Sequence, residues 1–185
     1  MTGHDPCPAT WHGVADVHTG TVNSPTNGST IGSTHGSTHG VTDAPTAPHR
    51  NDPEVVRRLL TTPGRWAIVG LSQNRARVAY RIAAYLQGLG MQIVPVHPRA
   101  EEVYGEAGYA TLAEVPGPVD VVDVFVRSEL AGDVVDQAIA AGARAVWLQL
   151  GVVDEAAAAR AAAAGLDVVM DTCPAIEAPR LGVTA

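Results

Sequence analysis

Short apolar runs rich in valine and isoleucine alternate with longer mixed segments between residue 52 and residue 171. Five such runs end in polar or glycine-containing turns, and their sequences are "WAIVG", "MQIVPV", "VDVVDVFV", "AVWLQL" and "LDVVMD". Near-continuous apolar runs are typical of strands that are buried on both faces. Strands that alternate with helices indicate a parallel sheet with helices on both sides. The pattern therefore predicts an α/β fold with five parallel strands.

Helices are predicted in the segments around these strands. The first helix precedes the first strand, where "NDPEVVRRLL" places Asp52 as the N-cap and Pro53 as the first helical residue. The second helix runs from about Arg77 to Gln87, because its apolar residues recur at helical spacing. The fourth is the alanine-rich segment "EAAAARAAAAG", whose composition favours a helix without indicating a function.

The third helix is predicted to begin at Ser128, a residue type that caps helices. The apolar residues expected to share its buried face are Leu130, Val134, Ala138 and Ile139. The preceding segment "GEAGYATLAEVPGPVD" is predicted to be a loop with one short helical turn. An irregular tail is expected after the fifth strand.

Residues 1–48 differ from the rest because Gly, Ser, Thr, His and Pro dominate them. Such a composition buries too little apolar surface to offset the entropy of ordering, so we expect a disordered low-complexity tail before a folded domain at 49–185. His35 and His39 lie four residues apart, but the repeat "GSTHGSTHG" accounts for that spacing. No metal site is predicted there.

The composition limits the class of partner. A chain of 185 residues with 46% hydrophobic residues, 17% charged residues and a net charge of -7 fits one acidic globular domain. This balance gives no electrostatic footprint for nucleic acid or an anionic membrane, so a small molecule is the expected partner. There is no apolar run of membrane-spanning length and no signal-peptide pattern, and we expect a cytoplasmic protein with reduced Cys7 and Cys173.

The turn after the first strand resembles a nucleotide-binding turn with two of its glycines replaced. In the dinucleotide fingerprint G-x-G-x-x-G the glycines serve the tight turn, the approach of the pyrophosphate and the packing of helix on strand. The corresponding residues here are Gly70, Ser72 and Arg75. Only the tight turn is retained, while a hydroxyl and a guanidinium stand where an anion would bind at the helix start. We therefore expect a phosphate site of a different construction.

The end of the second strand carries His97, Pro98 and Arg99. NAD-binding proteins usually place an acid there, which accepts hydrogen bonds from the ribose hydroxyls. A basic pair instead suits a ribose with an extra phosphate, and both NADP and coenzyme A carry one. The alternative interpretation is that Arg99 is a solvated loop residue.

The remaining strands end in further candidates, because open α/β sheets bind ligands at the carboxyl ends of their strands. These candidates are Phe125, Arg127, Gln149 and Gly151. Arg127 is the best ligand candidate among them, whereas Phe125 and Trp147 are more typical of a core.

For two more residues, one in the third strand and one after the fifth, the predicted role depends on whether the side chain is buried. Asp123 lies in an apolar strand, so its carboxyl group is expected to be satisfied by hydrogen bonds. Cys173 follows the fifth strand, where a thiol would either meet a ligand sulfur or remain a buried inert group, and the buried group is the more common case.

The segments "VGLSQNRARVAYRIAAYLQGLGMQIVPVHPRAEEVYGE", "VDVVDVFVR", "AVWLQLGVV" and "VVMDTCPAIEAPRL" resemble the small stand-alone coenzyme A-binding protein family, which is similar to the N-terminal domain of the succinyl-CoA synthetase alpha subunit. The resemblance covers residues 52–181. It implies a Rossmann-like five-stranded sheet with coenzyme A across its carboxyl edge, the pyrophosphate near the first turn and the adenosine toward the end of the second strand.

The resemblance also implies site residues, which are Gly70, Ser72, Arg77, Pro98, Arg99, Val124, Phe125, Arg127, Gln149 and Gly151. One departure concerns the start of the second helix. Family members commonly have a Pro-Ser pair there, whereas this chain has Val78 and Ala79. The missing serine hydroxyl would weaken a phosphate contact.

These observations favour non-catalytic binding of coenzyme A or an acyl-CoA, as a sensor or carrier. Succinyl-CoA synthetases need a phosphorylated histidine and an ATP-grasp partner, for which this chain has no corresponding segment. His97 has no evident carboxylate to orient it as a base, so no catalytic residue is predicted. Two alternatives remain, an NADP-binding oxidoreductase fragment and a regulatory interaction subunit with a vestigial nucleotide site.

Overall fold

The computed structural model describes residues 51–184. The predicted tail of residues 1–48, with His35, His39 and Cys7, lies outside the described residues, and the domain boundary there stays a prediction. The helices and strands, with one 3-10 turn η1, are α1 (Pro53–Thr61), β1 (Arg65–Val69), α2 (Val78–Gly88), β2 (Gln92–Val96), η1 (Leu112–Glu114), β3 (Val121–Val124), α3 (Ser128–Ala140), β4 (Ala145–Leu148), α4 (Glu155–Ala163), β5 (Asp167–Met170) and α5 (Pro174–Arg180). No helix in residues 51–184 is long and apolar enough to cross a membrane.

Local sequence sets the starts of two helices. The carboxylate of Asp52 accepts a hydrogen bond from the amide of Glu54 at 2.8 Å, which confirms the predicted cap of α1. Similarly, Asp154 accepts from the amide of Ala157 at 2.9 Å and caps α4. The short η1 turn confirms the helical turn predicted within the long loop.

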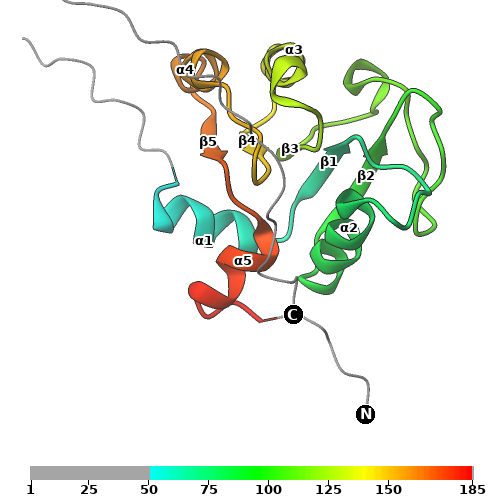
Figure 1. Ribbon diagram of the computed structural model, residues 1–185, viewed down its shortest axis with the longest axis horizontal. Coiled ribbons are helices and arrows are strands. Elements are labelled where there is room, and N and C mark those ends of the chain that lie inside the picture. Colours follow the sequence, from blue (N-terminus) through cyan, green and yellow to red (C-terminus); the bar gives the residue numbers. More distant parts are fainter. Residues whose placement is uncertain (1–50, 185) are drawn as a thin grey trace, which may run out of the picture. The chain divides into compact units, whose positions relative to one another are not determined.

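The five strands form one parallel sheet in the order β2-β1-β3-β4-β5 (Figure 1). In the middle of β1, Ala67 pairs with Val94 of β2 on one side and with Val122 of β3 on the other. The chain thus runs from β1 to β2 at one edge and then returns past β1 to β3. This topology confirms the predicted Rossmann-like α/β sheet.

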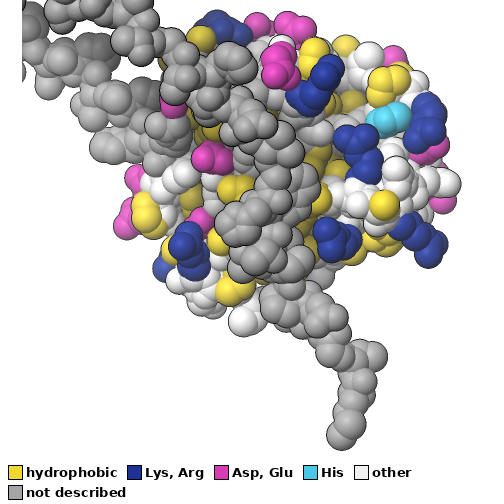
Figure 2. Space-filling view, in the orientation of Figure 1, with side chains coloured by type: hydrophobic (Ala, Val, Ile, Leu, Met, Phe, Trp, Pro, Cys, Tyr) yellow, Lys and Arg dark blue, Asp and Glu magenta, His cyan; other side chains and the backbone are white. Residues whose placement is uncertain are grey.

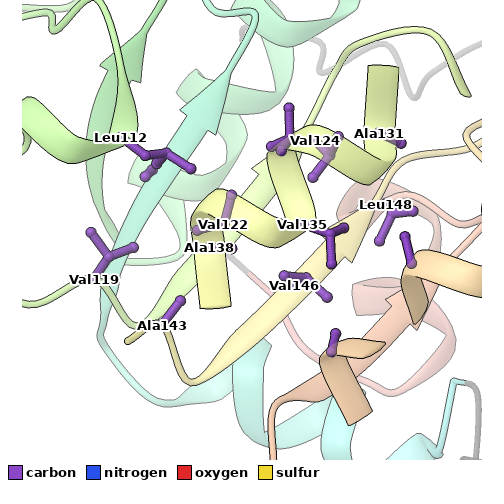
Figure 3. Packing of buried hydrophobic residues seen from close by; sticks show 14 of the residues in the cluster. Leu112, Val119, Val122, Val124, Ala131, Val135, Ala138, Ala143, Val146 and Leu148 are labelled. Carbon is purple, nitrogen blue, oxygen red and sulfur yellow. The ribbon is translucent and has the colours of Figure 1, made fainter. Parts of the chain in front are cut away.

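One face of the sheet is covered by α3 and α4 (Figure 1). Figure 3 shows how Ala131, Val135 and Ala138 of α3 lie among the buried valines and leucines of this face. The buried residues of α4 are all alanines, whose small side chains let that helix pack close to its neighbours. This face and its helices form one apolar core.

The opposite face is covered by α1, α2 and α5 (Figure 1). Its centre holds Trp66 and Trp147, which are fully buried and whose ring centroids lie 5.7 Å apart. The indole nitrogen of Trp147 donates to the carbonyl oxygen of Thr172 at 2.9 Å. Trp147 is therefore a core residue, as the sequence indicates.

The segment after β5 is a helix, so the prediction of an irregular tail was wrong. α5 has only seven residues and contains prolines at both 174 and 179, and such a segment has too few turns to show helical periodicity. Its Ala178 is fully buried against α1 and α2. Tertiary packing thus stabilises a helix that the local sequence does not indicate.

The predicted buried face of α3 was partly wrong. Leu130 is 44% exposed, while the buried residues of this helix are Ala131, Val134, Val135 and Ala138. These four residues follow the helical spacing i, i+3, i+4 and i+7, so the buried face starts at Ala131 and Leu130 lies outside it. The helix begins at Ser128 as predicted, but its N-cap residue is Arg127, and the Ser128 hydroxyl accepts from the amide of Val153 at 3.0 Å and does not cap the helix.

Candidate functional site

A cavity opens at the carboxyl ends of β1, β2 and β3. Its volume is about 350 Å³, which lies within the usual range of small-molecule sites. The lining residues are Val69, Gly70, Arg77, Val96, His97, Pro98, Ala110, Thr111, Phe125, Val126, Val134 and Gln137. Five of the residues predicted from the sequence therefore line one cavity, and they come from three separate strand ends.

Gly70 makes the tight turn after β1, as the sequence predicts. Its φ of +100° is one that side-chain-bearing residues rarely adopt, and an added Cβ would lie 2.9 Å from the carbonyl oxygen of Phe125. The Gly70 amide donates to the carbonyl oxygen of Val96 at 2.8 Å. Gly70 thus brings the ends of β1, β2 and β3 close together at the floor of the cavity.

The start of α2 supplies donors beside the cavity. Arg77 is its N-cap residue and lines the cavity, and no side chain caps the helix. The amides of Val78 and Ala79, in the first turn, have no hydrogen-bond acceptor among residues 51–184. An anion placed there would satisfy these N–H groups and interact favourably with the helix dipole.

Ser72 and Arg75 belong to the same turn but do not line the cavity. Ser72 is buried, and its hydroxyl accepts from the amide of Asn74 at 3.4 Å, which stabilises the turn itself. The guanidinium of Arg75 lies over the ring of Tyr80, 5.9 Å from its centroid. Of the turn's predicted ligand groups, the structure places only Gly70 and Arg77 in the cavity wall.

His97 and Pro98 line the cavity at the end of β2. The Nδ1 atom of His97 accepts a hydrogen bond from the amide of Arg99 at 3.2 Å. When a neutral imidazole accepts a hydrogen bond at Nδ1, its own hydrogen is on Nε2. Nε2 of His97 can then donate a hydrogen bond. Arg99 itself lies outside the cavity wall and pairs with Glu101, with 3.2 Å between Nε and Oε1.

Glu101 is a residue of this region that the sequence analysis missed. Its second carboxylate oxygen accepts from the amide of Gln73, in the turn after β1, at 3.0 Å. A carboxylate therefore does lie beside the first turn, although none stands directly at the end of β2. The rule that an acid follows the second strand would have found Glu101 if a few more loop residues had been considered.

Of the residues predicted at the ends of β3 and β4, only some line the cavity. Phe125 is half-buried and lines the cavity, so it belongs to both the core and the site. Arg127 is exposed at the start of α3, and its guanidinium has no partner among the described residues. Gly151 lies in the loop after β4, where its amide donates to Asp171 Oδ1 at 2.8 Å. Neither Arg127 nor Gly151 lines the cavity.

Gln149 is buried and bonds to Asp123 inside the sheet, with 2.7 Å between Nε2 and Oδ1. The other oxygen of Asp123 has no hydrogen-bond partner among the described residues, so the expectation of a hydrogen-bonded carboxyl group is confirmed at only one of its two oxygens. Burial raises the pKa of Asp123 to about 8, while the Gln149 hydrogen bond opposes this shift. Asp123 is therefore mostly protonated at neutral pH.

Cys173 is buried at the N-cap of α5 and packs in the core on the α1, α2 and α5 side of the sheet. The cavity instead includes residues of α3, on the other side. Cys173 thus has the environment of the buried cysteine that the sequence analysis gave as the more common case.

Four residues of the cavity come from segments that carry no nucleotide-binding motif. They are Val134 and Gln137 of α3 and Ala110 and Thr111 of the long loop. Val134 and Gln137 are three apart, so helical spacing places them on one face. That spacing alone does not show that the face meets a ligand.

Arginines supply the positive charge near the cavity. All twelve basic residues of the chain are arginine. On the face drawn in Figure 2, several arginines lie near the one described histidine, beside apolar surface. Guanidinium groups bind phosphate oxygens through paired N–H donors. Within residues 51–184, no cluster of three or more His, Cys, Asp and Glu residues is arranged to hold a metal ion.

A family model described as a CoA binding domain matches residues 64–179. The uncharacterized protein YneT of Bacillus subtilis (strain 168) is 34% identical over 118 residues, which are 64% of this chain and 87% of YneT. A hypothetical protein from Pyrococcus horikoshii OT3 superposes with a TM-score of 0.67 at 35% identity, covering 75% of this chain and 98% of that one.

A larger enzyme contains a similar domain. The dinucleotide forming acetyl-coenzyme A synthetase 1 of Ca. Korarchaeum cryptofilum, solved in complex with phosphate and ADP, has a TM-score of 0.55 and 25% identity. The similarity covers 63% of this chain and 27% of the synthetase.

Proposed function

The chain belongs to the CoA binding domain family, and from that premise we propose that it binds coenzyme A or an acyl-CoA in the cavity at the ends of β1, β2 and β3. The observation that carries this proposal is the convergence of Arg77, His97 and two unpaired helix amides beside one cavity. These groups are all hydrogen-bond donors, as a phosphate-bearing ligand requires.

The start of α2 is the proposed site of the pyrophosphate. The amides of Val78 and Ala79 have no acceptor among the described residues, so an anion bound there would accept hydrogen bonds from both. Arg77 adds a positive charge at the same place. Since backbone amides provide these donors, the site does not depend on the serine hydroxyl that Ala79 lacks.

The adenosine is proposed to occupy the cavity, which is lined by apolar side chains at Val96, Pro98 and Val134. Apolar walls with a few polar groups are typical of sites for flat heteroaromatic rings. Arg99, just outside the cavity wall, is the proposed partner of the ribose 3′-phosphate. Ser72, Arg75, Gln149 and Gly151 then support the fold of the site without touching the ligand.

We propose that the domain binds its ligand without transforming it. His97 is the histidine of the cavity, and its Nδ1 faces the amide of Arg99, not a carboxylate that would orient it as a general base. Asp123 is fully buried in β3 and does not line the cavity. This arrangement supports a sensor or carrier.

Calorimetric titration with coenzyme A tests the proposal on the full chain and on the Arg77→Ala variant. Loss of one charge-assisted hydrogen bond should weaken binding by about ten- to a hundredfold. Arg144→Ala is the matched control, because this exposed arginine lies at the amino end of β4 and pairs with Asp120. It should bind as the unaltered protein does.

The same titration with NADP and NAD addresses the alternative. NADP carries its extra phosphate on the 2′ oxygen and should bind more weakly than coenzyme A, and NAD more weakly still. Tighter binding of NADP than of coenzyme A would contradict the proposal and favour an oxidoreductase fragment. Absence of binding of any of them at high micromolar concentration would favour a vestigial site.

A further inference from the structure

The carboxylate of Glu101 accepts from two donors that belong to two different loops. Its Oε1 lies 3.2 Å from Nε of Arg99, and its Oε2 accepts from the amide of Gln73 at 3.0 Å. One of these donors follows β2 and the other lies in the turn after β1. The carboxylate is therefore an internal anion that joins the two loops beside the cavity.

The loop holds Glu101 in this position through several contacts. Val103 is buried in the core two residues later, and the side-chain amide of Gln73 donates to the carbonyl oxygen of Glu102 at 3.0 Å. Tyr104 donates to the carbonyl oxygen of Tyr80 at 3.1 Å. Because the backbone on either side is fixed, the carboxylate of Glu101 stays within reach of Arg99.

A second negative group near Arg99 opposes the carboxylate. The proposed 3′-phosphate and the Glu101 carboxylate both require the same guanidinium, and two anions this close repel each other. A phosphate can pair fully with Arg99 only after Glu101 has left it. A nucleotide without an extra ribose phosphate leaves the Glu101–Arg99 pair intact.

We propose that Glu101 determines specificity: it competes with the ribose phosphate for Arg99 and lowers the preference of the protein for coenzyme A over 3′-dephospho-coenzyme A. This inference rests on the proposed function, because it concerns the phosphate of the same ligand. Glu101→Gln removes the charge but keeps an oxygen that accepts from the Gln73 amide. The substitution thus frees Arg99 without opening the loop.

Calorimetric titration of both ligands, on the full chain at fixed low ionic strength, measures this effect. Glu101→Gln should raise the ratio of the two affinities by up to about fivefold in favour of coenzyme A, which is the upper end of the range for an exposed ion pair. Glu102→Gln is the matched control, because its carboxylate has no hydrogen bond or ion pair with another described residue. It should leave the ratio unchanged.

The double variant Arg99→Ala, Glu101→Gln separates competition for Arg99 from a general charge effect. In an Arg99→Ala background the Glu101→Gln substitution should no longer change the ratio. If coenzyme A binds but Glu101→Gln leaves the ratio as it was, the role of Glu101 is overturned and the proposed function stands. If coenzyme A binds to neither the unaltered chain nor Glu101→Gln, both are overturned.

Discussion

At the scale of single residues, the pairing of each arginine decides what it can do. Arg99 pairs with Glu101 and Arg75 lies over Tyr80, while Arg77 and Arg127 have no ion-pair partner among the described residues. The sequence shows that arginines follow the first two strands, but not which of them are free. The partners lie only two and five residues further along the chain, but the sequence does not show which nearby side chains an arginine meets, so only the folded arrangement separates paired arginines from unpaired ones.

The buried carboxyl group of Asp123 predicts that the free energy of unfolding depends on pH. Its pKa is raised from 3.8 to about 8 in the folded protein because of burial. Between these values the unfolded chain has lost the proton and the folded chain retains it, so stability falls as the pH rises. Asp123→Asn removes this titration. The difference in unfolding free energy between variant and unaltered protein should therefore increase with pH, by up to about 1.4 kcal/mol per pH unit.

Urea unfolding of both proteins at about pH 5 and about pH 8 measures this difference. Asn at this position keeps an oxygen for the Gln149 amide, so the buried hydrogen bond survives in the variant. The sign of the slope is the decisive result. A difference that is independent of pH, or that decreases as the pH rises, would show that Asp123 is ionised in the folded state.

At the scale of helices and strands, much of the fold follows from periodicity. The strands and α1 to α4 are predictable because each has a clear apolar pattern or a cap such as Asp52 or Asp154. α5 is not, because seven residues with two prolines form a helix only through contacts with α1 and α2. The burial of Leu130 was predicted wrongly because the buried face of α3 is the set Ala131, Val134, Val135 and Ala138, whose small alanines give a weaker apolar pattern than leucine does.

The cavity was predictable only in part. Gly70, His97 and Pro98 follow strands in sequence, and the rule that ligands bind at the carboxyl ends of strands identifies them. Thr111 and Gln137 come from a loop and a helix whose position depends on the order of the strands. Glu101 was missed for the same reason, because its contact with the turn after β1 joins two separate loops.

The turn between β1 and α2 is predicted to need a glycine at position 70 for stability. Gly70→Ala should lower the free energy of unfolding by about 2–4 kcal/mol, since it combines an unfavourable φ with a clash. The added Cβ would lie 2.9 Å from the carbonyl oxygen of Phe125, a backbone atom that cannot move without shifting the end of β3. Thermal or urea unfolding would measure the loss.

Gly165→Ala is the matched control for this turn. Gly165 follows α4 with a φ of +84°, but an added Cβ would meet nothing within 4 Å. Its substitution should cost only about 1 kcal/mol, the strain of the backbone alone. Equal losses at positions 70 and 165 would show that the close approach of the Phe125 carbonyl has no energetic importance.

At the scale of the whole folded unit, the order β2-β1-β3-β4-β5 determines where a ligand can bind. The chain passes from β1 to β2 on one side and then returns past β1 to β3 on the other, and such a switch point leaves a crevice at the carboxyl ends of these strands. The cavity lies at this point, lined by the residues that directly follow the three strands, Gly70 after β1, His97 after β2 and Phe125 after β3. A net charge of -7 does not prevent anion binding there, because arginines lie beside it.

The central claim is that coenzyme A binds in this cavity, and amide chemical shifts locate a ligand directly. A series of ¹H–¹⁵N correlation spectra of the full chain, recorded during titration with coenzyme A, is the decisive measurement. The largest shifts are expected for the unpaired amides of Val78 and Ala79 and for His97 and Thr111, which surround the cavity. The amide of Arg144, at the opposite end of the sheet, should not move. Unchanged spectra at a saturating ligand concentration, or shifts confined to residues outside the carboxyl edge, would contradict the claim.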